Sequence, residues 1–195
     1  MIEGDPIYVI EPHCDDAFLS LGWSIGAWAR EGRRVEVVTV YSDDDVRARE
    51  SARWATSVGA TWRGLGHRAS DAIALVGVTI TAAEPVPALP NRLLPEVMTE
   101  PSACRIWPLG LEHPEHVAVA AVTPVGDLRY IDTPYQLSLY HQTEVRRALD
   151  GRTFEWWLRP PRRKWDAAKL FASQARLFEH HTPDKLEAAA EIVVR

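Results

Sequence analysis

Cysteine and long apolar runs are scarce in this sequence. Its two cysteines, Cys14 and Cys104, lie far apart among 195 residues, so neither a disulfide framework nor a cysteine-based zinc finger is expected. No apolar run approaches the ~20 residues of a membrane-spanning helix. The first residues are acidic, whereas a secretion signal begins with basic residues. These absences predict a protein of the reduced cytoplasm with no membrane span.

Positive charge is also in short supply. The chain carries 22 Lys and Arg against 27 Asp and Glu, a formal net charge of −5. A general nucleic-acid or membrane-surface binder is therefore not expected, because both need a basic surface. Apolar residues make up 46% and charged residues 25%, as in ordinary globular proteins. The length favours one domain, spanning residues 1–195.

The first third of the chain alternates β-prone apolar runs with helical patterns. Strands are predicted at 7–10, 35–41 and 61–65, and helices at 15–30 and 46–58. A β-α-β-α-β rhythm favours a parallel sheet with helices on both faces. We therefore expect an α/β fold.

The later part of the chain has weaker patterns. Residues 72–90 contain three prolines and no clear period, so irregular structure or short strands are expected there. The remaining predicted elements are strands at 104–107, 129–132 and 153–158 and helices at 93–98, 114–122 and 164–178.

Two polar clusters follow predicted strands. Residues 12–16 read Pro-His-Cys-Asp-Asp, and residues 113–116 read His-Pro-Glu-His. Ligands of open parallel sheets bind outside the carboxyl ends of the strands, so the two clusters can converge. Each cluster alone also fits a helix cap or a solvated helix face. Their equivalent positions favour one shared site.

The spacing within the clusters suggests a metal centre. His13 and Asp16 are three residues apart, as are His113 and His116, so each pair can point the same way at a helix start. Imidazole and carboxylate ligands suit zinc, and catalytic zinc sites use three protein ligands and a water. The same donors can hold non-haem iron(II). Counting Asp15, five groups are available, of which three would bind metal and two would serve acid–base or electrostatic roles.

On these two motifs the chain resembles the PIG-L/LmbE-like zinc deacetylase family. Residues 12–16 are similar to the family's Pro-His-x-Asp-Asp, which is followed by a helix, and residues 113–116 are similar to its His-x-Asp-His. A weaker likeness is the Arg-x-x-Glu of residues 47–50, ahead of an alanine-rich helix that ends in Gly59. The combination of the two main motifs is specific, whereas either alone is not.

The resemblance implies a Rossmann-like fold, with a mostly parallel sheet and helices on both faces, and a single zinc ion. It implies Asp15 as the general base and His113 as a cation that stabilises the tetrahedral intermediate. The implied metal ligands are His13, Asp16 and His116.

Two further positions are expected near the site. Glu115 stands where the family has Asp, and we expect it to orient His113 from a shifted backbone. Arg47 is expected to contact sugar hydroxyls or a phosphate of the substrate; the alternative is an arginine on the helix surface.

The implied activity is that of a zinc-dependent hydrolase acting on a small-molecule amino-sugar substrate. It would remove the N-acetyl group from an N-acetylated amino sugar or its conjugate, such as a glycolipid, a thiol precursor or an antibiotic intermediate. One alternative is an amidase that releases a larger acyl group. Another is a non-hydrolytic, metal-containing carbohydrate-binding protein, which Asp15 and His113 argue against because binding alone needs neither.

Three other patterns are set aside. Residues 22–26 match the Gly-x-Ser-x-Gly of a serine hydrolase, but Ser24 falls inside a predicted helix and not at a strand-to-helix turn. Residues 64–69 match a relaxed dinucleotide fingerprint without a following helix, so a turn is expected. The pair at 180–181, two histidines, is expected in a loop or at a helix end.

Overall fold

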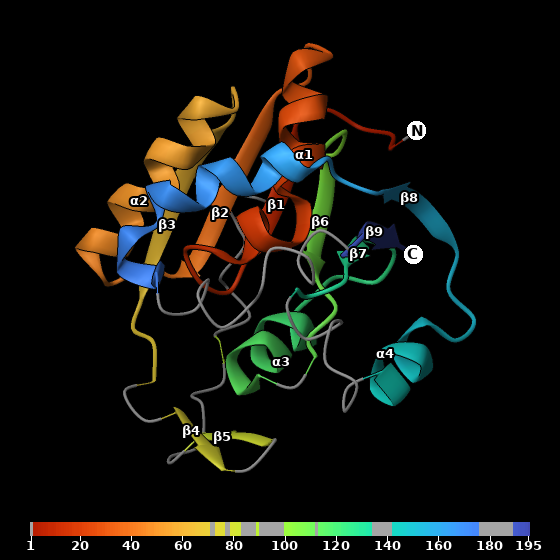
Figure 1. Ribbon diagram of the computed structural model, residues 1–195. Coiled ribbons are helices and arrows are strands. Elements are labelled where there is room, and N and C mark those ends of the chain that lie inside the picture. Colours follow the sequence, from red (N-terminus) through yellow and green to blue (C-terminus); the bar gives the residue numbers. More distant parts are fainter. Residues whose placement is uncertain are drawn as a thin grey trace.

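A seven-stranded sheet forms the centre of the computed structural model (Figure 1). The structure describes residues 2–70, 73–76, 79–82, 89, 100–111, 113–133, 142–175 and 189–195. The strand order is β3-β2-β1-β6-β7-β9-β8; the first five strands run parallel, and β9 is antiparallel to both neighbours. The expected α/β fold with a mostly parallel sheet is therefore confirmed. The strands are β1 (Ile7–Glu11), β2 (Val35–Tyr41), β3 (Thr61–His67), β6 (Cys104–Pro108), β7 (Leu128–Tyr130), β8 (Phe154–Leu158) and β9 (Glu191–Val194).

Helices cover both faces of this sheet. Alternate side chains of β1 point to opposite faces: Ile7 and Val9 pack with α1 and α2, whereas Tyr8 and Ile10 pack with α3 through Val119. The β4–β5 hairpin lies apart from the main sheet (Figure 1). The helices are α1 (Asp16–Arg30), α2 (Asp45–Ser57), α3 (Pro114–Ala121), α4 (Gln142–Leu149) and two 3₁₀ helices, η2 (Arg162–Leu170) and η3 (Ala172–Gln174); the hairpin strands are β4 (Ile73–Val76) and β5 (Thr79–Ala82).

The later half of the chain differs from its predicted elements. The helix expected at 164–178 is instead the two 3₁₀ helices η2 and η3 as far as residue 175. The turn expected at 64–69 is wrong for its first part, because β3 continues to His67 and pairs with Tyr41 of β2. Helix α4 and strand β9 were not predicted. The expected helix at 93–98 and the two histidines at 180–181 lie outside the described residues.

A buried ion pair joins η2 and β9 to the middle of α1. Lys164 Nζ lies 2.7 Å from Glu191 Oε1, and the two side chains are 2% and 1% exposed. The ammonium also donates to the carbonyl oxygen of Leu19 over 2.8 Å. The carboxylate accepts hydrogen bonds from the main-chain N–H groups of Trp23 and Ser24. The pair therefore forms hydrogen bonds to main-chain groups of α1, and its two charges also neutralise each other.

Ser24 lies inside α1, as expected, and is fully buried. Its hydroxyl donates to Glu191 and accepts from Trp156 Nε1 over 2.9 Å. The Gly-x-Ser-x-Gly pattern is thus a packed helix segment and not a nucleophile elbow. Both cysteines are free and buried. No helix in the described part of the chain is both long and apolar enough to span a membrane.

Candidate metal centre

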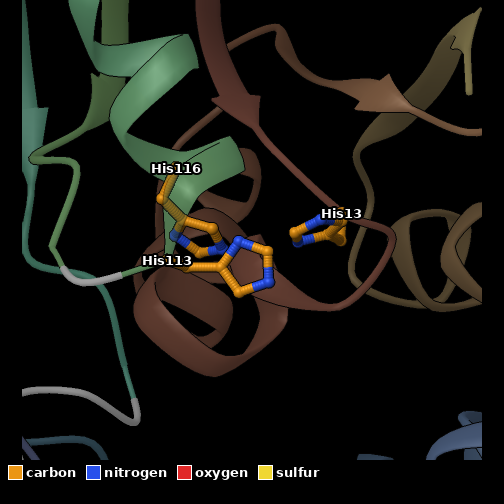
Figure 2. Close-up of side chains that lie close together, drawn as sticks. All are labelled: His13, His113 and His116. Atoms are coloured by element: carbon orange, nitrogen blue, oxygen red, sulfur yellow. The ribbon is translucent and has the colours of Figure 1, made fainter. Parts of the chain in front are cut away.

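The two polar clusters meet at the carboxyl ends of two neighbouring strands. Strands β1 and β6 pair in parallel, with Ile7 opposite Cys104, so the segments that leave them share one edge of the sheet. His13 lies in the turn between β1 and α1, whereas His113 and His116 lie at the start of α3 (Figure 2). The convergence expected from the sequence is therefore present.

Local sequence explains how each cluster is presented. Pro114 occupies the first turn of α3, where its missing N–H costs nothing, and His113 is the N-cap, accepting from the main-chain N–H of Glu115 over 3.3 Å. Helix α1 begins at Asp16, with Asp15 as its N-cap residue. Both helix starts therefore hold their polar side chains against the sheet edge.

Asp16 lies between the two histidines at the centre of the site. Its Oδ2 is 3.2 Å from His13 Nδ1 and 3.2 Å from His116 Nε2. Two donors of a tetrahedral zinc, each about 2.0–2.1 Å from the ion, lie about 3.3 Å apart. The two distances at Asp16 therefore match the spacing between zinc ligands, and the donor types suit zinc.

A second grouping shares two of these residues. One ligand atom from each of His13, His113 and His116 can be chosen so that all lie within 4.8 Å of one another. In this second grouping, His113 Nδ1 accepts a hydrogen bond from the Glu115 N–H. His13 and His116 are common to both sets.

Carboxylates occupy the outer nitrogens of both shared histidines. His116 Nδ1 lies 2.6 Å from Asp132 Oδ1, and His13 Nε2 lies 2.5 Å from Glu115 Oε2. Asp132 is fully buried and also accepts from the N–H of Gly110 over 3.0 Å. Metal-binding histidines characteristically donate their second N–H to such a carboxylate, which fixes the tautomer and the ring orientation.

Asp132 was not among the residues expected at the site. It is the last residue of the strand predicted at 129–132 and lies two residues beyond the end of β7, the neighbour of β6, so its position at the same sheet edge was the available signal. No motif marks it, because a single Asp after a strand is common.

The centre is strongly acidic, and this shapes the protonation of its histidines. Burial opposes protonation of His116, but Asp16 and Asp132 outweigh it and raise the pKa of this imidazole to about 10. Burial also disfavours the charged Asp16, yet His116 and His13 hold the pKa of that carboxyl well below its usual range. The acidic surroundings therefore favour a positive charge at His116.

His113 behaves differently from its neighbours. Burial, together with the nearby His116 and His13, lowers its pKa to about 3. Its place at the N-terminus of α3 acts in the same direction, because the helix dipole disfavours a cation there. These surroundings favour a neutral imidazole, whereas the sequence resemblance implied a cation at His113. Since Nδ1 accepts from the Glu115 N–H, the ring proton lies on Nε2.

Asp15 is paired with Arg47. An Arg47 guanidinium nitrogen donates to Asp15 Oδ1 over 2.9 Å, and the Asp15 side chain is 5% exposed. Burial raises the pKa of Asp15, and the charge of Arg47 opposes the rise. Arg47 Nε is buried with no hydrogen-bond partner among the described residues. The arginine that was expected on the substrate thus contacts a candidate catalytic carboxylate.

Glu115 does not orient His113 in the expected way. Its Oε2 lies 4.0 Å from His113 Nδ1 but 2.5 Å from His13 Nε2. The longer side chain of Glu reaches past its own helix to the turn that follows β1. The structure therefore assigns this carboxylate to a different histidine.

A second buried glutamate, Glu11, supports the first turn of α1. It accepts from the N–H of Ala17 over 2.7 Å and from the hydroxyl of Thr39. Burial raises its pKa to about 8. Glu11 is the last residue of β1 and lies one residue beyond the strand predicted at 7–10. A carboxylate next to apolar strand residues was the usable signal.

No family model matches this sequence, and no curated protein matches it. Solved structures do match, at low sequence identity. The zinc-inhibited form of teicoplanin deacetylase Orf2 aligns with a TM-score of 0.65 and 17% identity, over 97% of this chain and 96% of the other. An N,N'-diacetylchitobiose deacetylase from Pyrococcus horikoshii aligns with a TM-score of 0.57 and 14% identity, over 93% and 76%.

The same fold is also found in a protein of different chemistry. GalB, a 4-carboxy-2-hydroxymuconate hydratase from Pseudomonas putida, aligns with a TM-score of 0.54 and 16% identity, over 91% of this chain and 83% of the other. The fold implied by the sequence resemblance is thus confirmed. The choice of reaction depends on the residues at the sheet edge.

Proposed function

We propose that this chain is a metal-dependent hydrolase that removes the N-acetyl group from a small amino sugar or an amino-sugar conjugate. The observation that carries the proposal is the meeting of His13, Asp16 and His116 at zinc-ligand spacing beside a further carboxylate, Asp15. The fold shared with two deacetylases supports it.

The ligand set fits zinc, and iron(II) is the alternative because it takes the same two-histidine, one-carboxylate donors. When bound, the ion supplies Lewis-acid polarisation of an amide carbonyl and lowers the pKa of a water molecule. His13, Asp16 and His116 hold it, and Asp132 fixes the ring of His116 through Nδ1.

Asp15 is the general base of this proposal. Arg47 binds Oδ1, whereas Oδ2 accepts no hydrogen bond from the part of the chain that the structure describes and is the oxygen that takes a proton from water. Its raised pKa suits this role, because a base works best with a pKa near the working pH. The same carboxyl then returns the proton to the departing amine.

His113 stabilises the developing oxyanion as a neutral donor. Nδ1 accepts from the helix backbone, so Nε2–H is the donor side of the neutral ring. A preorganised donor of this kind contributes about 3 kcal/mol to transition-state stabilisation. The neutral form replaces the cation expected from the sequence without removing the role.

Metal analysis tests the ligand set. The purified chain is expected to retain about one zinc or iron ion per molecule, and His116→Ala is expected to retain none. Glu155→Gln is the control, because Glu155 contacts Arg195 at the far end of the sheet and lies outside the ligand group. Equal metal in the wild type and His116→Ala would reject the assignment.

Acetate release tests the reaction. A panel of N-acetylglucosaminides is incubated with the wild type and with Asp15→Asn, and acetate is quantified. Release by the wild type and its loss by at least about 100-fold in Asp15→Asn support the proposal. Release of only longer acyl groups would favour an amidase, and tight sugar binding without release would favour a carbohydrate-binding protein.

A further inference from the structure

The Glu115 carboxylate bridges two parts of the chain that are far from it in sequence. Oε2 lies 2.5 Å from His13 Nε2, 102 residues away, and Oε1 accepts from the main-chain N–H of Ser70 over 2.5 Å, 45 residues away. The side chain is 1% exposed. Both carboxylate oxygens are therefore used, one on a candidate metal ligand and one on the segment that follows β3.

Contacts from other residues fix the main chain and the ring of His13. Asp16 Oδ2 contacts Nδ1 and also accepts from the His13 main-chain N–H over 2.8 Å. The ring of Tyr41 stacks on the imidazole, with 5.7 Å between ring centroids and 28° between planes. The Glu115 carboxylate contacts the other ring nitrogen, Nε2. A proton on Nε2 leaves the Nδ1 lone pair directed at Asp16, which is the side that faces His116.

The contact of residue 115 with His113 does not need its side chain. The hydrogen bond to His113 Nδ1 comes from the main-chain N–H, which any residue except proline supplies. The carboxylate itself is 4.0 Å from that nitrogen. The side chain of Glu is long enough to reach His13 and Ser70. The side chain of Asp is one methylene shorter.

We propose that Glu115 is a positioning residue for the metal ligand His13 and that it couples the segment 66–70 to the metal centre. This inference rests on the proposed metal site. It assigns to residue 115 a different partner from the one expected of an Asp at that position. It also connects the segment 66–70, which begins within the last residues of β3, directly to metal affinity.

Zinc affinity without substrate is the first test. Metal-free wild type, Glu115→Gln and Glu115→Asp are titrated with zinc against a chromophoric chelator, and the cobalt(II) absorption spectrum of each is recorded. Both variants are expected to bind zinc about 10- to 100-fold more weakly, the usual effect of losing a carboxylate behind a metal-bound histidine. Glu155→Gln, which alters a contact to Arg195 at the far end of the sheet, is the matched control.

Amide hydrogen exchange of metal-free, folded protein is the second test. Residues 66–70 are expected to exchange faster in Glu115→Asp than in wild type and to be unchanged in Glu155→Gln. Zinc affinities within about twofold of wild type, with an altered rate or pH profile alone, would show that Glu115 acts on His113 and would overturn the inference. A wild type that binds neither zinc nor iron would instead overturn the proposed function and this inference with it.

Discussion

Arg47 donates a hydrogen bond to Oδ1 of Asp15 over 2.9 Å, across the gap between α2 and the start of α1. The positive charge favours the ionised carboxylate, and burial favours the protonated form. Removing the charge in Arg47→Met is therefore expected to raise the pKa of Asp15 further. The acidic limb of the kcat/KM profile for acetate release should move to higher pH.

The same profile separates two roles of Arg47. If the guanidinium acts on Asp15, the limb moves. If it only binds substrate, as the sequence suggested, KM rises and the limb stays in place. A neighbouring control is Arg53→Met, an exposed position on the same helix.

Asp132 is expected to strengthen metal binding through His116. Replacement by Asn keeps an acceptor 2.6 Å from Nδ1 but removes its charge. We expect zinc affinity to fall by about 10-fold, the lower end of the range for such partners. Chelator competition on the metal-free protein gives the value, and an unchanged dissociation constant would contradict the prediction.

The metal-free protein should lose stability as pH rises because of Glu11. Its pKa is about 8 in the folded state against an ordinary 4.5, so the folded state binds the extra proton between these values. Stability from this proton is fully present below pH 4.5 and is lost as pH rises through about 8. Glu11→Gln stays neutral, so its free energy of unfolding relative to wild type should improve by up to about 4 kcal/mol from pH 4.5 to 8. Urea unfolding at the two pH values measures this change, and parallel pH curves for the two proteins would refute it.

Substitutions in the buried pair of Lys164 and Glu191 are expected to lower the free energy of unfolding. Lys164→Met leaves a buried carboxylate without its cation and is expected to cost about 3–5 kcal/mol in denaturant unfolding. Buried ion pairs are often replaced by apolar residues without loss, but Glu191 also accepts from two main-chain N–H groups of α1. The double variant Lys164→Met, Glu191→Leu should therefore remain less stable than wild type. A double variant as stable as wild type would show that these N–H contacts contribute little.

Ser24 should matter for stability and not for catalysis. Its hydroxyl is buried between Glu191 and Trp156, so Ser24→Ala is expected to lower the free energy of unfolding by about 1–3 kcal/mol. Acetate release at saturating substrate should stay within about twofold of wild type. Loss of release by a folded Ser24→Ala would restore the serine-hydrolase interpretation.

The first half of the fold was predictable because its signals are local. The apolar runs at β1 and β2 and the helical pattern of α1 repeat over short windows, and a β-α-β succession restricts the sheet to a few topologies. The order of β9 and β8 depends on pairing with β7, which no local window contains. The 3₁₀ geometry of η2 was missed because its apolar spacing is close to that of an α-helix.

The candidate site also has a part that local sequence predicts and a part that depends on tertiary pairing. His13 and Asp16 lie in the segment that follows β1, and His113 and His116 in the segment that follows β6; the structure brings the two segments together as expected. Their supporting carboxylates could not be assigned, because Asp132 reaches the site only through the β6–β7 pairing. The pairing of Glu115 with His13 and not with His113 likewise depends on the tertiary structure.

The parallel pairing of β1 with β6 has a kinetic consequence. Ile7 and Cys104 are opposite one another across a sequence separation of 104 − 7 = 97 residues, so the proposed ligands from the two motifs become neighbours only after this long loop has closed. A metal ion that needs ligands from both motifs would therefore bind after loop closure and would not speed it. Once bound, it would link both ends of the closed loop and would have to be released before the central strands separate. The ion should therefore slow unfolding while leaving the folding rate almost unchanged, so that metal content sets the lifetime of the native protein.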